Sequence, residues 1–544
     1  MTAHWQRGPG EIDYQTPEST RELERKLITL LKLKSGTALN QYLHKTGELD
    51  TSKSVESTSV TLDSKLSSGG LRSVNLTGII GYNPPDEEET REFPIFIKRA
   101  LSYLRNSSGS SAGQCRKARL EALLLAQLST CPESPLPPVL LVDPDTMDCQ
   151  HNIPQTIVMK RLQGRDLGAR YRCLSDNQVN VLNFVYKHDG QITTQDVMKN
   201  LVEFNSSTLL CDLFLLEKMG LVTIISDGKK DYISLNQEEV SKRFNLLPYK
   251  ARVSDGMRLE EDSMRLEENP KFRKRMIDAF RKGIEALVTF EKQASDFKFE
   301  PDCNPKSETA YEKRTVIQEK IDHILAYRRE HQGDQRIPRT VSRKFLDMYQ
   351  TVMFSDNRDQ VVQQGDPNIF NFFESDDGKV YLLDLFHCKR DEEGSDLIDF
   401  IQSVSVLSDL KEDERTGLLS YGLELKGIPK REKFKQWAKR RELDTGLYVL
   451  GAIAGTYINH LMTRDEDESK KLKIWGIAKQ GDMIRQFEMY RGYMILNRLF
   501  SIRSHSHDKE ATEIAEYIEF FLTGESSEGL VTNPFYENPY NQDS

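Results

Sequence analysis

The sequence predicts an α+β protein, with short strands in its first two thirds and mostly helices after residue 397. Three observations support this. The segment Phe93–Lys98 alternates apolar residues in the manner of a strand ending in a lysine. The runs Val361–Val362 and Val380–Leu383 are apolar and lie on either side of the turn-forming Asp376–Lys379. From Leu397 to Leu522, several segments have helical spacing of apolar residues.

Composition limits the class of protein. With 544 residues the chain is long enough for several domain-sized units, and its 38% hydrophobic content indicates extensive polar surface. A net charge of -9 argues against nucleic acid or an anionic membrane as the main partner. The seven cysteines contain no C-x-x-C pair, and Met1–Tyr14 lacks the apolar core of a signal peptide. We therefore expect a cytoplasmic protein without a membrane span.

The most informative segment is Gly365-Asp366-Pro367-Asn368-Ile369-Phe370-Asn371, which Asp384 follows at the end of the next apolar run. A carboxylate, an amide oxygen and a second carboxylate in this order are typical of enzymes that transfer phosphoryl groups. Asp366 would accept the proton of an acceptor hydroxyl, and Asn371 and Asp384 would bind Mg²⁺. The alternative is an acidic turn in a β-hairpin, because Asp, Asn and Gly also form turns.

Gln364-Gly365-Asp366-Pro367-Asn368, together with Asn371 and Leu382-Leu383-Asp384, resembles the catalytic core of the aminoglycoside phosphotransferase and choline kinase-like group. It also resembles that of the UbiB-type atypical kinases. The resemblance implies a bilobal protein-kinase-like fold that uses ATP and Mg²⁺. It further implies that Asp396, followed by Leu397, braces the catalytic loop. This sequence departs from the group at Gln364, where the group often has histidine.

A kinase-like fold also requires an upstream lysine and glutamate. Lys98, at the end of its strand, resembles the lysine that holds the nucleotide phosphates, although it could be an ordinary solvated lysine. The segment Arg119–Leu128 has helical periodicity. Glu121 in this helix is the best candidate to pair with Lys98, and its alternative role is to favour the helix dipole.

Two further segments complete the predicted nucleotide site. Ser67–Ser73, with Gly69 and Gly70, resembles a glycine turn whose backbone amides approach phosphate, but such a loop can also be a plain linker. Thr156–Leu167 resembles the strand, hinge and crossover of the same group. The backbone near Met159 and Lys160 would then hydrogen-bond the purine.

Nearly two hundred residues separate the hinge-like segment from the catalytic loop, and the first of them have their own pattern. The sequence predicts three helices followed by two strands, which together resemble a winged-helix domain: Leu174–Asp189, Gln191–Leu201 with Thr193 or Thr194 as cap, Leu209–Met219, Leu221–Ser226 and Tyr232–Leu235.

The charge of this insertion favours a protein partner over DNA. Leu174–Asn236 contains eight acidic and five basic residues, whereas phosphate neutralisation dominates affinity for nucleic acids. After it, Pro270 is expected to begin a helix with Phe272, Met276, Phe280 and the equivalent positions beyond on one buried face.

The sequence thus predicts a phosphotransferase that uses ATP and Mg²⁺ on an unidentified hydroxyl acceptor. The alternative is a nucleotide-binding pseudokinase scaffold that recruits a protein partner through the insertion. Ser35–Leu66 and Glu525–Ser544 are polar and are expected to be disordered. The predicted organisation is an N-terminal helix and polar extension (1–66), an N-lobe and hinge (67–167), the winged-helix-like insertion (174–236), a helical segment (237–345), the catalytic C-lobe (346–524) and a tail (525–544).

Overall fold

The protein is a mixed helix-and-sheet chain that divides into two compact units, Met1–Gln163 with Glu300–Asn304 (unit 1) and Gly164–Phe299 with Pro305–Ser544 (unit 2). The computed structural model describes residues 28–29, 36–46, 48–62, 73–85, 87, 89–100, 111–131, 133–142, 156–174, 176–188, 192–200, 212–213, 215–226, 230–244, 269–299, 304–305, 307, 310–332, 345–347, 349, 360–428, 432–462 and 516–518.

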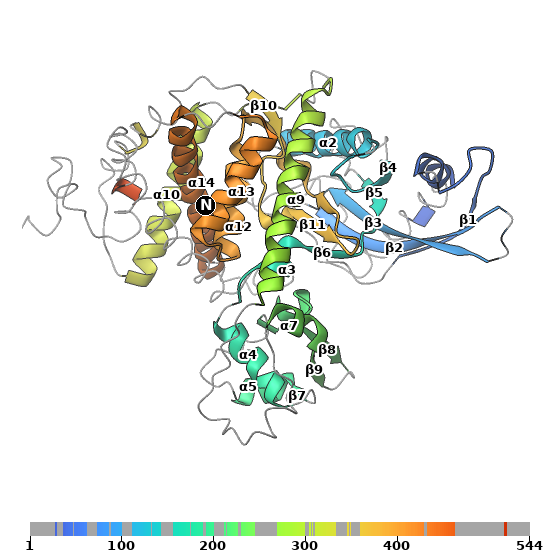
Figure 1. Cartoon of the computed structure of the whole chain (residues 1–544), viewed down its shortest axis with the longest axis horizontal. Coiled ribbons are helices and arrows are strands. Elements are labelled where there is room, and N and C mark those ends of the chain that lie inside the picture. The colour runs from blue at the N-terminus through green and yellow to red at the C-terminus, as the bar shows by residue number, and fades with distance from the viewer. Residues whose placement is uncertain are drawn as a thin grey trace, which may run out of the picture. The chain divides into compact units, whose positions relative to one another are not determined.

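Unit 1 is built on one antiparallel sheet (Figure 1). In β3, Phe93, Ile95 and Ile97 are buried while the residues between them are half-buried, which is the period-2 pattern expected of a strand with one face on a core. The helix α2 contacts β4. The sheet order is β1 (Glu56–Leu62), β2 (Ser73–Asn83), β3 (Arg91–Ala100), β5 (Thr156–Lys160) and β4 (Val139–Val142), and α2 spans Ser111–Leu128.

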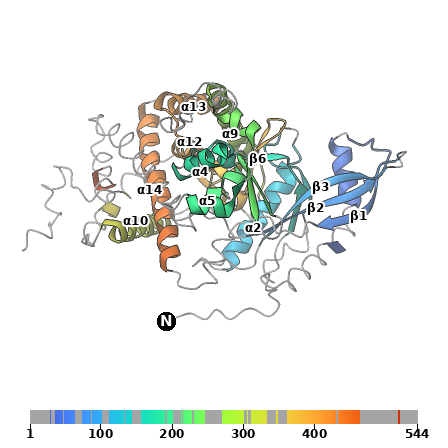
Figure 2. The same cartoon turned by 90° about the horizontal axis from the view of Figure 1, so that it is seen from below.

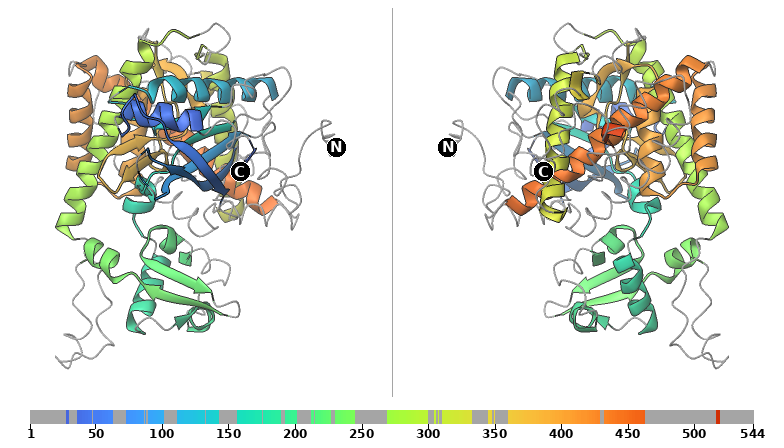
Figure 3. Two further views of the ribbon diagram at one scale, coloured as in Figure 1. Left: turned by 90° about the vertical axis from the view of Figure 1, so that its right-hand side faces the viewer. Right: turned by 90° about the vertical axis from the view of Figure 1, so that its left-hand side faces the viewer.

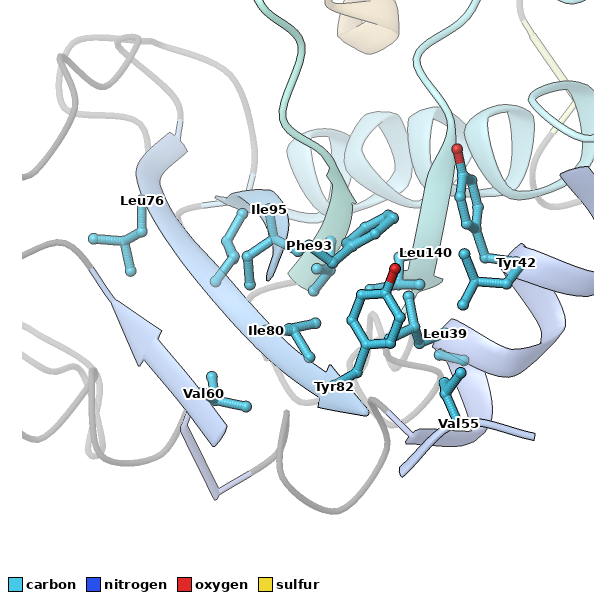
Figure 4. Packing of buried hydrophobic residues seen from close by; sticks show 14 residues of the cluster. Leu39, Tyr42, Val55, Val60, Leu76, Ile80, Tyr82, Phe93, Ile95 and Leu140 are labelled. Carbon is cyan, nitrogen blue, oxygen red and sulfur yellow. The ribbon is translucent and has the colours of Figure 1, made fainter. Parts of the chain in front are cut away.

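A helix at residues 36–46 packs on this sheet, so the expectation that Ser35–Leu66 is disordered is wrong for the described part of that stretch. Leu39 and Tyr42 of the helix lie in the core cluster with Phe93 of β3 (Figure 4). The Tyr42 and Phe93 rings meet edge to face with centroids 5.2 Å apart. Asn40 fixes the chain that follows, because its side chain exchanges hydrogen bonds of 2.7 and 2.8 Å with the backbone of Val55.

Unit 2 contains two small antiparallel sheets around the predicted catalytic loop. One has the order β12 (Val380–Leu382), β11 (Phe372–Ser375) and β6 (Gly164–Asp166). The other pairs β10 (Gln360–Gln363) with β13 (Lys389–Glu392). The strands and the turn expected around residues 361–383 are therefore confirmed. Short 3-10 helices, η3 (Ile369–Asn371) and η4 (Leu385–His387), follow the loop and β12.

Long helices form the rest of unit 2. The predicted helix from Pro270 is α9, and Phe272, Met276, Phe280, Ile284 and Leu287 are buried on one face, as expected. α10 crosses α14 (Figure 2), and Gly451 and Gly455 of α14 allow the close approach, since an added Cβ would meet Lys320 at 2.2 Å and His323 at 2.3 Å. The helices are α9 (Pro270–Ser295), α10 (Ala310–Gln332), α12 (Ser395–Leu407), α13 (Glu412–Leu425) and α14 (Glu432–Met462).

Within the part of the chain that the structure describes, no helix has the length and apolar character needed to cross a membrane. This includes α14, which contains most of the uncharged stretch 445–463 and in which Leu447, Leu450 and Ala454 are buried.

The insertion, which we call the inserted module (residues 174–244), has its own apolar core around Val181, Leu216 and Ile233 (green in Figure 3). Thr193 caps the second helix: its hydroxyl accepts the N–H of Asp196, whose carboxylate accepts the N–H of Thr193. The elements are α4 (Asp176–Lys187), β7 (Ile192–Thr193), α5 (Thr194–Asn200), β8 (Val222–Ser226), β9 (Asp231–Leu235) and α7 (Gln237–Arg243), with sheet order β7, β9, β8.

Of the third predicted helix, residues 212–213 and 215–218 are helical, and 201–211 lie outside the described residues. The tail Glu525–Ser544 also lies outside them.

We predict that Leu39→Ala destabilises unit 1 by about 2–5 kcal/mol, the usual cost of removing a fully buried leucine side chain. Leu39 is 0% exposed among the residues that cover the sheet. Hydrogen exchange of β2 and β3 amides against urea concentration measures the loss. Gln41→Ala, at an exposed position of the same helix, is the control. Equal exchange in the two variants would show that the helix does not stabilise the sheet.

Candidate active site

Unit 1 contains a buried ion pair between the two residues that the sequence proposed as partners. Lys98 lies on β3, and its Nζ is 2.7 Å from Oε1 of Glu121 on α2. The side chains are 17% and 4% exposed, so both groups are largely removed from water. A pair at this depth fixes the lysine in one position at the end of its strand. The predicted pairing is confirmed, and a role in binding phosphate stays a prediction.

The hinge-like segment uses some of its backbone donors inside unit 1. The N–H of Lys160 donates to the carbonyl of Pro138 at 2.9 Å, and the N–H of Arg161 donates to the carbonyl of Pro94 at 2.9 Å. These two donors are therefore committed to the sheet. Purine binding at Met159 and Lys160 stays a prediction. It would have to use backbone groups of this segment other than the N–H groups of Lys160 and Arg161. Gly69 and Gly70 lie outside the described residues.

In unit 2 the predicted catalytic loop folds back on itself. The Asn371 side-chain N–H₂ donates to the backbone carbonyl of Asp366 at 2.7 Å and to its Oδ2 at 3.2 Å. Gly365 has a φ of +82°, and an added Cβ would lie 2.2 Å from the carbonyl oxygen of His387. Only glycine combines this backbone angle with so close a contact. The loop therefore brings Asp366 and Asn371 together, as the motif requires.

Asp384 follows β12 in a strained conformation. Its φ of 53° is left-handed, which is uncommon for a residue with a side chain. The preceding Leu383 donates its N–H to the carbonyl of Asn371 at 2.7 Å, so the two predicted metal ligands are tied through their backbones. Asp384 is exposed, and its carboxylate accepts the N–H of Phe386 at 3.4 Å. Strain of this kind persists where the surrounding structure imposes it, and it is frequent at functional positions.

Gln364 links the two halves of this arrangement, a role that motif matching missed. Its Nε2 donates to the carbonyls of Leu383 at 3.2 Å and Asp384 at 2.8 Å, while its Oε1 accepts the N–H of Asp366 at 2.7 Å. Gln364 is 0% exposed. Because an amide has both donors and an acceptor at one end, glutamine can make all three bonds. Gln364 therefore connects Asp366 to Asp384 in this chain. The only sequence signal was a long amide side chain directly before Gly365.

Asp396 holds the start of the loop through hydrogen bonds to its backbone. Its carboxylate accepts the N–H of Gln364 at 2.7 Å and the N–H of Gly365 at 3.2 and 3.3 Å. The side chain is fully buried at the start of α12, and burial together with the charge of nearby Asp399 raises the pKa of Asp396 to about 7. The hydrogen bond from Gly365 opposes this rise. The brace implied by the sequence resemblance is present.

A charge network supports the strand that follows. Asp391 of β13 is 1% exposed and lies 3.1 Å from the Nζ atoms of Lys313 and Lys389 and 3.4 Å from Arg441. Burial acts to raise the pKa of Asp391, but the three cations outweigh it and hold the pKa well below its usual range. The network connects β13 to α10 and α14 and so fixes the sheet from which the loop begins.

The residues present fit a hard divalent cation. The amide nitrogen of Asn371 faces Asp366, so the Oδ1 atom of Asn371 lies on the other side of the amide group. Asp384 adds an exposed carboxylate. Amide and carboxylate oxygens are the donors that Mg²⁺ prefers, and Mg²⁺ usually takes few protein ligands and keeps several waters. Among the described residues, no cluster of three or more His, Cys, Asp or Glu side chains offers an alternative metal centre.

No family model matches the chain. A search of curated proteins found no match either.

The chain is similar to several solved structures. One is a variant of aminoglycoside 2'-phosphotransferase IIIa in complex with GDP (10% identity, TM-score 0.35, 84% of this chain and 97% of that one). Another is spectinomycin phosphotransferase with ADP and spectinomycin (11%, 0.33, 90% and 97%). A third is a choline/ethanolamine kinase family protein from Mesorhizobium loti (11%, 0.31, 79% and 92%). They belong to the group that the catalytic-loop motif resembles. Similarity at this level assigns no substrate or residue role to this chain.

We predict that Asp396 makes stability depend on pH. Its pKa is about 4 in an unfolded chain and about 7 in the folded one. Between these values the folded chain holds more protons, so this group stabilises the fold fully below pH about 4 and loses its contribution as pH rises through about 7. Asp396→Asn should therefore flatten the fall in urea midpoint between about pH 5 and pH 7.5.

The control is Asp413→Asn, an exposed acid on α13, which should keep the wild-type slope. If Asp396→Asn keeps it too, Asp396 does not titrate in this range.

Proposed function

We propose that this chain is a kinase-fold phosphotransferase that transfers the γ-phosphoryl group of ATP to a hydroxyl acceptor. The observation that carries the proposal is the loop geometry of unit 2, in which Asp366 contacts Asn371 and Gln364 joins the backbones of Asp366 and Asp384. An acidic β-turn needs neither the buried bridge at Gln364 nor the brace from Asp396. The alternative of a simple acidic turn therefore does not account for the contacts of Gln364 and Asp396.

In the proposed reaction Asp366 accepts the proton of the acceptor hydroxyl. The hydroxyl oxygen forms a bond to the γ-phosphorus of ATP, the bond from that phosphorus to the β,γ-bridging oxygen breaks, and ADP leaves. Asn371 and Asp384 would hold Mg²⁺, which neutralises charge on the phosphates. Lys98, positioned by Glu121, would hold the phosphates. We assign Gly69 and Gly70 to the phosphate-covering turn, and Met159 and Lys160 to purine binding.

We also assign the inserted module to the winged-helix class, because its helices are followed by the β8–β9 wing. The third helix lies partly outside the described residues, so this assignment rests on the order of elements and on the separate core. The acidic balance of the segment favours a protein partner over nucleic acid. We place the protein in the cytoplasm, given its scattered cysteines.

The alternative, a nucleotide-binding scaffold, is favoured by the wing. Ile225 and Tyr232 form a cross-strand pair and are 60% and 39% exposed. Exposed apolar pairs of this kind are suited to a protein contact. Labelling a metabolite extract with γ-³²P-ATP and the purified chain would identify a small-molecule acceptor and separate an enzyme from a scaffold.

We predict that Asp384→Ala abolishes Mg²⁺-dependent nucleotide binding, because the carboxylate supplies a charged ligand to the metal. Thermal stabilisation by ATP, measured with and without Mg²⁺, tests this. Asp413→Ala removes an exposed acid from α13 and should behave as wild type. Equal stabilisation of all three proteins would refute the assignment of Asp384.

We predict that Asp366→Asn binds Mg-ATP almost normally but lowers turnover roughly 10²- to 10⁴-fold, the usual contribution of a general base. Asparagine keeps an oxygen that can accept from Asn371, so the loop should be retained. Calorimetry measures binding, and release of labelled phosphate or product measures turnover. A wild type that transfers no phosphoryl group to any acceptor or water, while Asp366→Asn keeps the cellular role, would establish the scaffold.

A further inference from the structure

Two arginines fix the inserted module to neighbouring elements: Arg165 joins it to β6, and Arg243 joins it to α3 (Leu167–Tyr171), the short helix that follows β6. The first is Arg165 of β6. Its Nη1 donates to the carbonyl of Met219 at 2.6 Å, and its guanidinium lies against Gly220 of the module. Gly220 has a φ of +69°, and a Cβ there would meet Arg165 Nη2 at 2.0 Å. The module therefore contacts the Arg165 guanidinium through the carbonyl of Met219 and through Gly220, where the lack of a Cβ leaves room for it.

The second is Arg243, at the end of α7. It is 3% exposed, and its Nη2 donates to the carbonyl of Arg172, the C-cap of α3. Its Nη1 lies 3.5 Å from the carbonyl of Arg170. The guanidinium also stacks 5.1 Å from the ring centroid of Phe272 on α9. The last carbonyls of a helix lack partners within it and carry partial negative charge, so a cation here stabilises α3.

The other side of α3 contacts the exit of the catalytic loop. Arg170 Nη1 and the Tyr171 hydroxyl each donate to Oε2 of Glu374 at 2.7 Å. Glu374 is 4% exposed on β11, the strand that begins directly after Asn371. The ring of Phe370 lies over Gly168, where an added Cβ would be 2.2 Å from it. A shift of α3 would therefore displace residues on both sides of Asn371.

We infer that Arg165 and Arg243 are positioning residues, through which the inserted module holds β6 and α3, and that β6 and α3 thereby keep Asn371 and Asp366 in their catalytic geometry. The module is then a structural support for the catalytic loop as well as a docking domain. The opposing view is that the module is only tethered by its chain ends. On that view, loss of the arginine contacts loosens α3 and leaves the loop unchanged. The kinetic consequence rests on the proposed function, whereas the structural one does not.

The experiment compares full-length Arg165→Met and Arg243→Met with wild type by amide hydrogen exchange. Methionine keeps much of the apolar stem and removes the donors. Lys242→Met, on the same helix as Arg243 but exposed, is the matched control. We expect exchange in Ile369–Phe372 to rise about 10- to 100-fold in both arginine variants, the effect of losing hydrogen bonds from a charged donor. Amides of α12 and α14 should keep their wild-type rates, which shows that the change is local.

Faster exchange in α3 with unchanged exchange in Ile369–Phe372 would overturn the inference. Should Arg243→Met fail to fold, Arg165→Met decides the question alone, because Arg165 is only partly buried. In the kinetic arm, both variants should lower kcat for release of labelled phosphate from Mg-ATP while KM for Mg-ATP is retained. A wild type without turnover would contradict the proposed function but leave the exchange result valid.

Discussion

The buried carboxylate of Asp396 is the constraint on which the candidate catalytic loop in unit 2 depends. It accepts N–H groups from Gln364 and Gly365, at the point where the chain turns out of β10. Once this turn is fixed, the Gln364 amide can reach both the N–H of Asp366 and the carbonyl of Asp384. Asp366 and Asp384, which belong to two separate segments, thereby take defined positions. A carboxylate in this place is costly to bury, as its raised pKa shows, and the backbone bonds offset part of that cost.

Contacts with other elements also stabilise the short strands around the loop. β10, β11, β12 and β13 each have three or four residues, too few to be stable alone. They are held from outside, by the cations around Asp391 and by Glu374, which binds Arg170 and Tyr171. Charged contacts with helices α3, α10 and α14 therefore hold these strands, and the strands in turn hold the loop. In the described residues of unit 1, the Lys98–Glu121 pair fixes a side chain by the same means.

The sequence predicted those features that depend on neighbouring residues. The strand at Phe93–Lys98, the hairpin after Asn371 and the helix from Pro270 follow from periodicity and local turn signals. Local capping limited the cap of the second module helix to Thr193 or Thr194, and the structure shows Thr193. The helix at 36–46 was missed because its buried residues, Leu39, Tyr42 and Leu43, stand in a polar sequence. Only contact with the sheet gives that stretch enough buried surface to stay ordered.

By itself, then, the sequence identified the candidate residues: Asp366, Asn371 and Asp384 by their spacing, and Lys98 with Glu121 by their placement on a strand and a helix. The tertiary structure decided which groups meet. Gln364 bonds to a residue 20 positions away, Arg170 to one 204 positions away, and the N–H groups of Lys160 and Arg161 are taken by Pro138 and Pro94. Spacing along the chain reports local geometry, whereas a hydrogen bond between distant segments exists only after the fold has brought them together.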